Sequence, residues 1–277
     1  LISHLENDFS TVIARVDGMI TYVPRLDEPQ IRQAERLKVI ACHSCPQELA
    51  QTLAAHGIQV TLVPSLWDTV ADMTLGLMFA AARNIPQVHR AIVNGEWQHT
   101  DLKTRYSGGD VFGKTLGIIG LGRIGEILAR RVQGFDMKIL YADPIRKPDL
   151  EKELSLRYKT LEALLSESDF VVLLAPLNES TRGMVGESHL RRMKRSAVLI
   201  NTGRGALIDE TALVRALRER WIGAAGLDVF VEEPLPGGHP LLELDNVVLT
   251  PHLGGSTKDC DLVLVEDALR VLRGEAP

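Results

Sequence analysis

"GIIGLGRIG" (residues 117–125) contains three glycines in the pattern G-x-G-x-x-G and decides the fold. Its apolar start predicts a buried strand, and the apolar residues that recur at spacings of three and four after it predict an amphipathic helix. A strand, a glycine-rich turn and a helix in this order are typical of the phosphate-binding unit of a dinucleotide-binding domain.

The three glycines of this stretch have separate physical roles. Gly120 permits a tight turn, and Gly122 lets the backbone approach a pyrophosphate because it has no side chain. Gly125 allows the helix to pack closely on the strand, and the N-terminus of the helix attracts negative charge. We therefore expect the pyrophosphate of a dinucleotide at this turn.

Asp143 ends the next apolar run, "KILYADP", close to the distance of about 20 residues that the dinucleotide-binding pattern requires. Its carboxylate can accept hydrogen bonds from both hydroxyls of a ribose and would repel a 2′-phosphate. Asp143 therefore favours NAD over NADP, whereas the nearby cations Arg146 and Lys147 favour the opposite choice.

Apolar runs and helical patterns alternate along the chain, which predicts parallel sheets covered by helices on both faces. We expect six strands of one doubly wound domain at residues 115–120, 138–142, 169–174, 197–201, 224–229 and 247–250. A smaller α/β unit before it has expected strands at 19–23, 38–42 and 59–63. The nearly all-apolar stretch 70–85 predicts a helix that must be covered on all sides, and a helix over 258–274 is expected to return to the smaller unit.

The composition indicates a globular protein and excludes several classes of function. Hydrophobic residues make up 45% and charged residues 24% of the chain, and a net charge of −5 offers no basic surface for nucleic acid. No apolar run approaches the roughly 18 residues of a membrane helix, so we expect no membrane partner. The three cysteines indicate a reducing cytoplasm rather than a disulfide framework. The chain starts at Leu1, not Met, so we expect the natural start to be missing.

Two motifs are set aside because their context is wrong. "GGDVFGKT" (residues 108–115) fits a triphosphate-binding loop, but its Lys114 and Thr115 lead into an apolar β-run instead of a helix. "CHSC" (residues 42–45) has the spacing of a redox or metal pair, but the chain has no second pair to complete a zinc site. We interpret it as a loop after a strand, and we expect no metal.

Four charged or titratable side chains follow the later strands at their carboxyl ends, where such folds bind ligands: Arg204, Asp228, Glu233 and His252. Arginine offers a planar fork for a carboxylate or a carbonyl oxygen, and histidine can exchange a proton with a hydroxyl near neutral pH. A glutamate beside the histidine favours the imidazolium and orients the ring. Together with a cofactor that carries hydride, this set suits the reduction of a 2-keto acid.

Four segments, in this order along the chain, resemble the signatures of the D-isomer-specific 2-hydroxyacid dehydrogenases: "GIIGLGRIG", "LINTGRGALIDE", "AAGLDVFVEEP" and "LTPHLGGST". The likeness runs from about residue 37 to residue 274. It implies an α/β fold of two doubly wound parallel-sheet domains with a cleft between them, a Rossmann NAD domain inserted into a smaller flavodoxin-like substrate domain. We therefore expect the substrate domain at residues 1–69, the dinucleotide-binding domain at 70–255 and the returning helix of the substrate domain at 256–277.

The resemblance also implies roles for single residues. Arg204 would anchor the substrate carboxylate and polarise the keto group, His252 would be the acid/base, and Glu233 would be its partner. Asp228 would bind the carboxamide side of the nicotinamide, and the helix that starts at Val70 would help to form a homodimer. The expected cofactor is NAD, and its expected binding residues are Thr74, Gly120, Gly122, Arg123, Ile124, Gly125, Asp143, Pro176, Thr181, Thr202, Asp228 and Gly254.

The chain departs from the family's pattern in two places. Family members usually have a glycine-rich turn ending in aspartate after the strand expected here at 38–42, and its backbone N–H groups help to bind the substrate carboxylate. This chain has "ACHSCPQELAQ" there, and it has Leu174 where a histidine is common. The substrate therefore stays open among glyoxylate, hydroxypyruvate, 3-phosphohydroxypyruvate and lactate-type acids, of which we favour the glyoxylate or hydroxypyruvate type.

Three functions fit the pattern. The first is an NAD-dependent oxidoreductase that interconverts a small 2-keto acid and its D-2-hydroxy acid. The second is an NADH-sensing, corepressor-like binding protein without turnover, because such proteins in the same family retain the site residues. The third is a phosphonate-type oxidation on the same scaffold. The complete set of arginine, glutamate and histidine favours the first.

Overall fold

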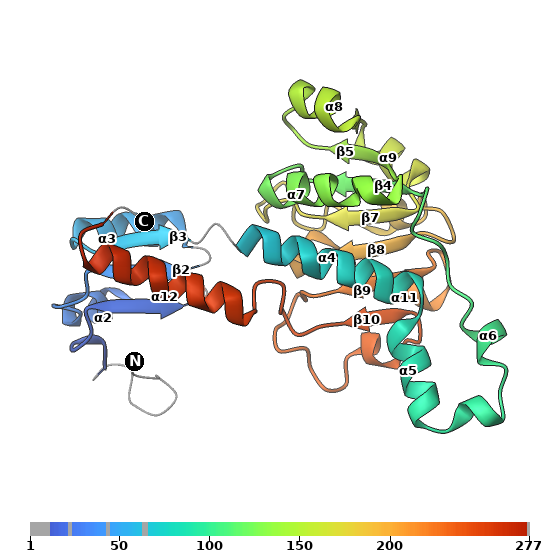
Figure 1. Cartoon of the computed structure of the whole chain (residues 1–277), viewed down its shortest axis with the longest axis horizontal. Helices are drawn as coiled ribbons and strands as arrows, with labels where there is room; N and C mark the ends of the chain where they lie inside the picture. The colour runs from blue at the N-terminus through green and yellow to red at the C-terminus, as the bar shows by residue number, and fades with distance from the viewer. Residues whose placement is uncertain (1–11, 22–23, 43–44, 63–65, 276–277) are drawn as a thin grey trace. The chain divides into compact units, whose positions relative to one another are not determined.

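The computed structural model describes residues 12–21, 24–42, 45–62 and 66–275, and Figure 1 labels its helices and strands. The chain divides into two compact units. The larger unit is Val70–Gly254, and the smaller unit combines Leu1–Thr69 with Gly255–Pro277. One boundary falls inside helix α4 (Leu66–Ala82), and each unit has its own parallel sheet.

The larger unit contains a seven-stranded sheet in the order β10-β9-β8-β7-β4-β5-β6, and all its paired strands are parallel. The strands are β4 (Thr115–Ile119), β5 (Lys138–Ala142), β6 (Arg157–Tyr158), β7 (Phe170–Leu173), β8 (Val198–Asn201), β9 (Ala224–Leu227) and β10 (Val247–Leu249). The chain runs outward from β4 to β6 and then continues at β7 on the other side of β4. This reversal between β4 and β7 is the switch point of a Rossmann-type fold, where such sheets bind ligands.

Strand β6 was missing from the sequence-based prediction, which placed six strands in this unit. It has two residues, Arg157 and Tyr158, and both are exposed at the edge of the sheet. A strand this short and this exposed has no apolar alternation in the sequence, so periodicity could not reveal it.

Helices cover both faces of the larger sheet, because successive side chains of each strand point to opposite sides. Leu116 and Ile118 of β4 pack with buried residues of α4 and α7 (Arg123–Arg131). Ile119 packs on the other face with buried residues of α9 (Leu161–Glu167), α10 (Glu187–Leu190) and α11 (Glu210–Arg218). The predicted parallel α/β fold with a Rossmann-type domain is therefore confirmed.

Helix α4 is followed by a short helical arm. Asn84, with a left-handed φ of 53°, separates α4 from α5 (Ile85–Val93), so the expected helix over 70–85 ends earlier than predicted. Figure 1 shows α5 and α6 (Leu102–Arg105) projecting from the layers around the sheet. Gln87 of α5 donates hydrogen bonds to the carbonyl oxygens of Asp245 and Val247, which joins the arm to the edge strand β10.

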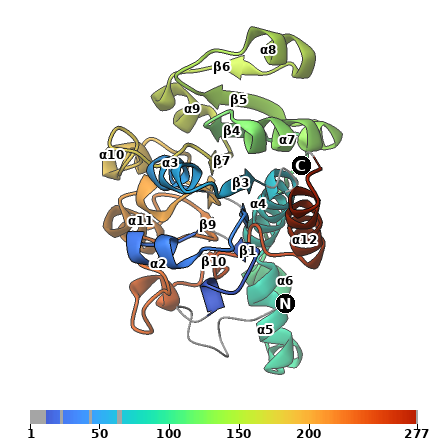
Figure 2. The same ribbon diagram turned by 90° about the vertical axis from the view of Figure 1, so that its left-hand side faces the viewer.

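The smaller unit contains a parallel sheet in the order β1-β2-β3, with bounds Gly18–Thr21, Val39–Cys42 and Gln59–Leu62. Its helices are α2 (Glu28–Gln33), α3 (Gln47–Ala55) and α12 (Lys258–Leu272). Figure 2 shows α2 and α3 on one side of this sheet and α12 on the other, where Leu264 and Ala268 pack on Ala41. The predicted strand ends at 22–23 and 63 lie outside the described residues.

No helix in the part of the chain that the structure describes combines the length and the apolar character needed to cross a membrane. Helix α8 (Pro148–Leu154) follows strand β5 in the larger unit.

The close packing of α9 on β4 gives a test of the fold. A Cβ atom on Gly117 would lie 2.5 Å from Cδ2 of Leu164 and closer still to the Ser168 hydroxyl, whereas one on Gly134 would meet nothing within 4 Å. Overpacking of a core typically costs about 1–3 kcal/mol, so we expect Gly117→Ala to lower the free energy of unfolding by about that amount. Gly134→Ala, the matched control, should change it by less than about 0.5 kcal/mol.

Urea unfolding followed by circular dichroism measures both variants. Equal stability of the two alanine variants would contradict the packing of α9 on β4 described above.

Candidate functional site

The residues expected in the site follow the carboxyl ends of the strands of the larger sheet, and parallel strands bring these ends to one edge. Gly120 follows β4, Asp143 follows β5, Pro176 lies just beyond β7, Thr202 and Arg204 follow β8, Asp228 follows β9, and His252 lies just beyond β10. The contacts among these residues show how closely they are gathered.

The glycine-rich turn is tightly packed except at its middle glycine. Gly120 has a φ of 92°, and a Cβ there would lie 2.6 Å from the backbone nitrogen of Ala175, so only glycine fits against the loop after β7. A Cβ on Gly125 would lie 2.8 Å from the carbonyl oxygen of Gly120, because α7 starts so close to the turn. A Cβ on Gly122 would meet nothing within 4 Å.

Gly122 therefore faces open space that the fold itself does not fill. Glycine there leaves room for a ligand to reach the backbone at the N-terminus of α7, which begins with Arg123 and Ile124. The turn thus fits the pyrophosphate of a dinucleotide.

Asp143 lies in direct contact with this turn. Its Oδ2 accepts a hydrogen bond of 2.8 Å from the backbone N–H of Leu121, and its Oδ1 accepts one of 2.9 Å from that of Ile145. The Lys147 ammonium donates to the carbonyl oxygen of Leu121. The acidic side chain and a cation therefore both bind the backbone of one residue of the glycine-rich turn.

Two further pairs of expected cofactor residues are joined by hydrogen bonds. Thr181 donates from Oγ1 to the carbonyl oxygen of Pro176 at 2.6 Å. Thr74 is buried on α4, and its Oγ1 lies 2.8 Å from that of Thr202 after β8. Because Thr74 donates its own hydrogen to the carbonyl oxygen of Val70, the hydroxyl of Thr202 donates to Thr74.

His252 and Glu233 form a hydrogen-bonded pair. Nδ1 of His252 lies 2.8 Å from Oε2 of Glu233, and Oε1 of Glu233 accepts a hydrogen bond from the backbone N–H of Phe230 at 3.0 Å. An ionised carboxylate only accepts, so Nδ1 carries the hydrogen and a neutral ring leaves Nε2 without one. The side chains are 48% and 36% exposed, which leaves the imidazole accessible to a ligand. Glu233, and not the neighbouring Glu232, makes this contact.

Asp228 holds the turn that carries His252. The side chain is buried, with 1% of the residue exposed, and Oδ1 accepts hydrogen bonds from the Thr250 hydroxyl at 2.5 Å and the Leu253 N–H at 2.8 Å. Oδ2 accepts from the N–H of Gly254 at 2.7 Å, and the backbone oxygen of Asp228 accepts from the N–H of His252 at 2.9 Å. His252 adopts a left-handed φ of 55° within this turn. Asp228 thus holds the backbone of the turn from which the imidazole projects.

Asn201 holds the turn of Arg204 in a similar way. Its buried amide donates from Nδ2 to the carbonyl oxygen of Arg204 at 2.9 Å, and its Oδ1 accepts from the N–H of Gly203 at 3.1 Å. The Arg204 guanidinium is exposed and donates from Nη1 to the carbonyl oxygen of Gly203 at 2.7 Å. A Cβ on Gly205 would overlap the backbone of Phe230, so this turn packs directly on the segment that holds Glu233.

A continuous series of contacts therefore connects Arg204 with His252 through Phe230 and Glu233. Sequence reasoning missed two of the residues that support this set, Asn201 and the Thr250 hydroxyl. The available signal was a polar residue at the end of an otherwise apolar strand, in "INTG" and "LTPH".

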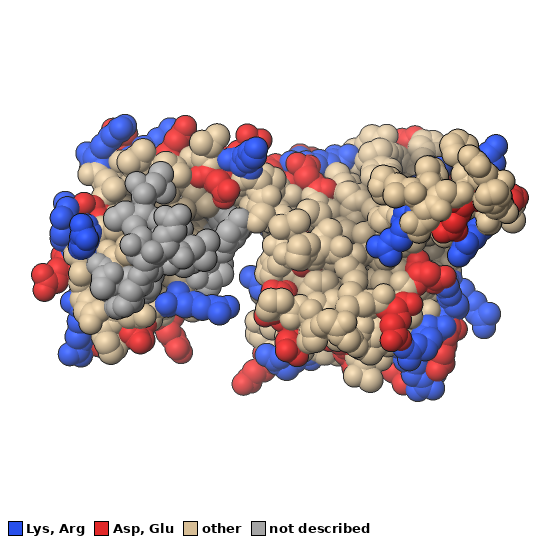
Figure 3. All heavy atoms as spheres, turned by 90° about the horizontal axis from the view of Figure 1, so that it is seen from below, with Lys and Arg blue, Asp and Glu red and all other residues tan. Residues whose placement is uncertain are grey.

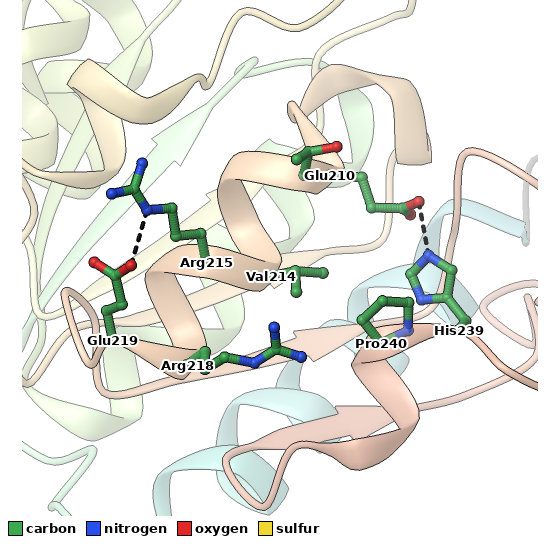
Figure 4. A pocket seen from close by; sticks show the side chains of 8 residues that line it. Glu210, Val214, Arg215, Arg218, Glu219, His239 and Pro240 are labelled. Atoms are coloured by element: carbon green, nitrogen blue, oxygen red, sulfur yellow. Dashed lines mark hydrogen bonds and ion pairs between the residues drawn. The ribbon is translucent and has the colours of Figure 1, made fainter.

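The remaining surface of the larger unit offers a hollow of about 540 Å³ beside α11 and η4 (Pro240–Glu243). Figure 4 shows that polar side chains of this hollow pair with one another: Arg215 with Glu219, and His239 with Glu210. None of its lining residues belongs to the expected site. Because its charges already have protein partners, this hollow is not the candidate site.

The two motifs set aside from the sequence have clear structural contexts. Thr115 begins β4, so the loop of "GGDVFGKT" leads into a strand, as predicted. Cys42 ends β2, and residues 43–44 of "CHSC" lie outside the described residues. The described cysteines, Cys42, Cys45 and Cys260, are not joined by disulfides. The described residues include no cluster of three or more His, Cys, Asp or Glu side chains that could hold a metal.

The charge distribution can be followed in Figure 3. On the face shown there, Lys and Arg side chains are interspersed with Asp and Glu. The described residues of each unit therefore present mixed charge in this view.

Comparisons with known proteins identify the family of the chain. The family model described as "D-isomer specific 2-hydroxyacid dehydrogenase, NAD binding domain" matches residues 75–254. A glyoxylate reductase of Korarchaeum cryptofilum is 43% identical over an alignment of 277 positions that covers 96% of this chain and 83% of that relative. The TT0316 protein of Thermus thermophilus superposes with a TM-score of 0.85 at 37% identity, covering 100% of this chain and 89% of that one.

A third similar structure is an NADPH-dependent glyoxylate/hydroxypyruvate reductase of Sinorhizobium meliloti. It superposes with a TM-score of 0.76 at 30% identity, covering 96% of this chain and 85% of that one. The chain belongs to the D-isomer-specific 2-hydroxyacid dehydrogenases and is a nicotinamide-dependent oxidoreductase of 2-keto and 2-hydroxy acids.

Proposed function

We propose that this protein uses NAD to interconvert a small 2-keto acid of the glyoxylate or hydroxypyruvate type and its D-2-hydroxy acid. Arg204, Glu233 and His252 are the catalytic set. The observation that carries the proposal is the 2.8 Å contact between His252 and Glu233 beside the turn of Arg204. The likeness to glyoxylate reductases supports the choice of substrate class.

The cofactor would be held along the carboxyl edge of the sheet. The turn from Gly120 to Gly125, with Arg123 and Ile124, would hold the pyrophosphate, and Asp143 the adenosine ribose. The nicotinamide half would be held by Thr74, Pro176, Thr181, Thr202, Asp228 and Gly254. When bound, the nicotinamide supplies a hydride to C2 of the keto acid or accepts one from C2 of the hydroxy acid.

His252 moves the proton in this reaction. In reduction, the protonated ring donates from Nε2 to the oxygen on C2 as that oxygen gains charge, and in oxidation the neutral ring accepts the proton. Glu233 accepts the hydrogen bond from Nδ1, which orients the ring and leaves Nε2 for the proton that is exchanged with the substrate.

Arg204 binds the other end of the substrate. Its guanidinium can form two parallel hydrogen bonds with the carboxylate, and its positive charge polarises the adjacent keto group. Asn201 and Gly205 fix the backbone of this turn, so the side chain of Arg204 extends from a fixed point.

The organisation of the whole molecule is also part of the proposal. The larger unit would bind the cofactor, and the smaller unit would serve as the substrate domain. A homodimer is supported by apolar side chains on the helical arm, such as Val93 and Trp97, which are 71% and 65% exposed. A reducing, cytoplasmic location is supported by cysteines that form no disulfides with each other.

His252→Gln tests the proton transfer. Loss of a general acid typically slows catalysis by about 10²–10⁴-fold, so we expect kcat for glyoxylate reduction to fall by that factor. Loss of NADH absorbance at 340 nm follows the reaction. The control is His239→Gln, because His239 forms a similar pair with Glu210 outside the site and its loss should leave turnover close to normal. Near-normal turnover of His252→Gln would remove this residue from the mechanism.

Arg204→Lys tests substrate anchoring. Lysine keeps the charge but cannot form two parallel hydrogen bonds, so we expect KM for glyoxylate to rise about tenfold or more, a change of about 1.4 kcal/mol. The Kd of NADH, measured by fluorescence titration, should stay within about twofold. Arg218→Lys on α11 serves as the control. An unchanged KM for keto acids would contradict the anchoring role.

Asp228→Asn tests how the turn of His252 is held. The N–H groups of Leu253 and Gly254 bind different oxygens of the carboxylate, and asparagine replaces one of these oxygens with an NH2 donor, so at least one of the two N–H groups loses its acceptor. Hydrogen bonds to charged groups are worth about 1.5–3 kcal/mol, so we expect amide exchange at Leu253 and Gly254 to accelerate tenfold or more and kcat to fall. Asp209→Asn, which disturbs only the cap of α11, is the control. Unchanged exchange at these two amides would show that Asp228 does not hold the turn.

A further inference from the structure

We propose that Glu151 is a cofactor-selecting residue, which occupies the guanidinium of Arg146 and thereby withholds that cation from the 2′-phosphate of NADP. The inference rests on the dinucleotide site of the proposed function. It adds a residue outside the glycine-rich turn, on α8, that decides between the two nicotinamide cofactors.

The segment after β5 contains determinants for both cofactors. In Rossmann-type folds an acidic residue at this strand end binds the ribose hydroxyls of NAD, whereas a nearby arginine accommodates the 2′-phosphate of NADP. Asp143 and Arg146 occupy such positions here, only three residues apart in the sequence. The sequence alone therefore does not decide between NAD and NADP. The choice depends on whether the guanidinium of Arg146 is already bound by another side chain of the protein.

Glu151 binds Arg146 through two parallel contacts. Nε of Arg146 lies 2.8 Å from Oε1 of Glu151, and Nη2 lies 2.8 Å from Oε2. This bidentate geometry is the strongest that an arginine and a carboxylate can form, and it uses two of the five guanidinium donors. A bound carboxylate also cancels the charge that would attract a phosphate.

The pair is anchored on its carboxylate side. The side chain of Glu151 is 15% exposed, whereas that of Arg146 is 63% exposed. The buried Tyr141 of β5 donates from its hydroxyl to Oε1 of Glu151 at 2.7 Å and accepts from the backbone N–H of Lys147 at 2.8 Å. Tyr141, whose ring is buried, therefore fixes the position of Glu151, and Glu151 binds the exposed guanidinium of Arg146.

The ion pair persists at any pH used for assays. The hydrogen bonds from Arg146, and then from Tyr141, lower the pKa of Glu151 from its usual 4.5 to about 2. A depressed pKa means that the carboxylate stays charged above the usual value and loses its charge only as the pH falls toward 2. Arg146 therefore faces a negative partner throughout the neutral range.

The second cation of the segment is also engaged, because Lys147 donates to the carbonyl oxygen of Leu121. Asp143, in contrast, accepts only two backbone hydrogen bonds through its carboxylate in the described structure, and a carboxylate has about four acceptor positions. The segment thus offers a ribose-binding acceptor while its two cations are bound to the protein. This combination favours a ribose with a free 2′-hydroxyl.

Glu151→Gln tests the inference without relying on catalysis. Glutamine keeps the size of the side chain and can still accept from Tyr141, but it lacks the charge that binds Arg146. Titration calorimetry with ADP-ribose and with its 2′-phosphate should show the 2′-phosphate binding about tenfold more tightly than to the wild type, with ADP-ribose within twofold. The ratio of kcat/KM for NADPH to that for NADH should rise by a similar factor.

Two further variants separate this effect from a general change of charge. Glu219→Gln removes the same charge from a similar pair with Arg215 on α11, shown in Figure 4, and should leave the preference unchanged. Arg146→Ala combined with Glu151→Gln should abolish the gain, because the gain depends on the released guanidinium.

An unchanged preference of Glu151→Gln with intact ADP-ribose binding would overturn this inference alone, and so would a gain that survives in the double variant. Binding of neither nucleotide by the wild-type protein would overturn the dinucleotide site itself together with the inference.

Discussion

The site depends on one buried carboxylate, that of Asp228 at the end of β9. A buried charge is costly unless hydrogen bonds satisfy it, and three donors from the turn after β10 do so here: the Thr250 hydroxyl and the N–H groups of Leu253 and Gly254. Any other conformation of that turn would leave the carboxylate without these donors. The left-handed backbone of His252 is thus maintained by its surroundings, as is usual for such residues at functional sites. This constraint fixes the backbone from which the imidazole projects, and the hydrogen bond to Glu233 then orients the ring.

Hydrogen bonds between a polar side chain and the backbone of a turn also occur at two other strand ends of the larger sheet. Asn201, the last residue of β8, binds the backbone of the Arg204 turn through both atoms of its amide, and Asp143 after β5 binds a backbone N–H of the glycine-rich turn. In each case a polar side chain at the end of an apolar strand fixes the turn that bears a functional group. A parallel sheet brings such turns to one edge, so groups distant in sequence can form one site. Phe230 and Glu233 complete the connection between Arg204 and His252.

Much of this arrangement could be predicted from the sequence, because long apolar runs bounded by glycine or proline identify buried strands. The bounds of β2 and β5 differ from the expected ranges by at most one residue. Strand β6 could not be found, because two exposed residues carry no pattern. The resemblance to a known family gave the identity of Arg204, Glu233 and His252, whereas the contacts of Asp228 depend on a turn whose conformation no local pattern predicts. Likewise, the sequence places Arg146 near Asp143, but its pairing with Glu151 depends on a hydroxyl that projects from the buried Tyr141.

The most direct measurement is a crystal structure of the protein with NAD and a bound 2-hydroxy acid. We expect Nε2 of His252 within hydrogen-bond distance, about 2.6–3.2 Å, of the oxygen on C2, with the Arg204 guanidinium on the carboxylate. The contacts of Asp228 with Thr250, Leu253 and Gly254 should be unchanged. An imidazole directed away from the bound acid, with the turn still held by Asp228, would contradict the proposed role of His252 in proton transfer.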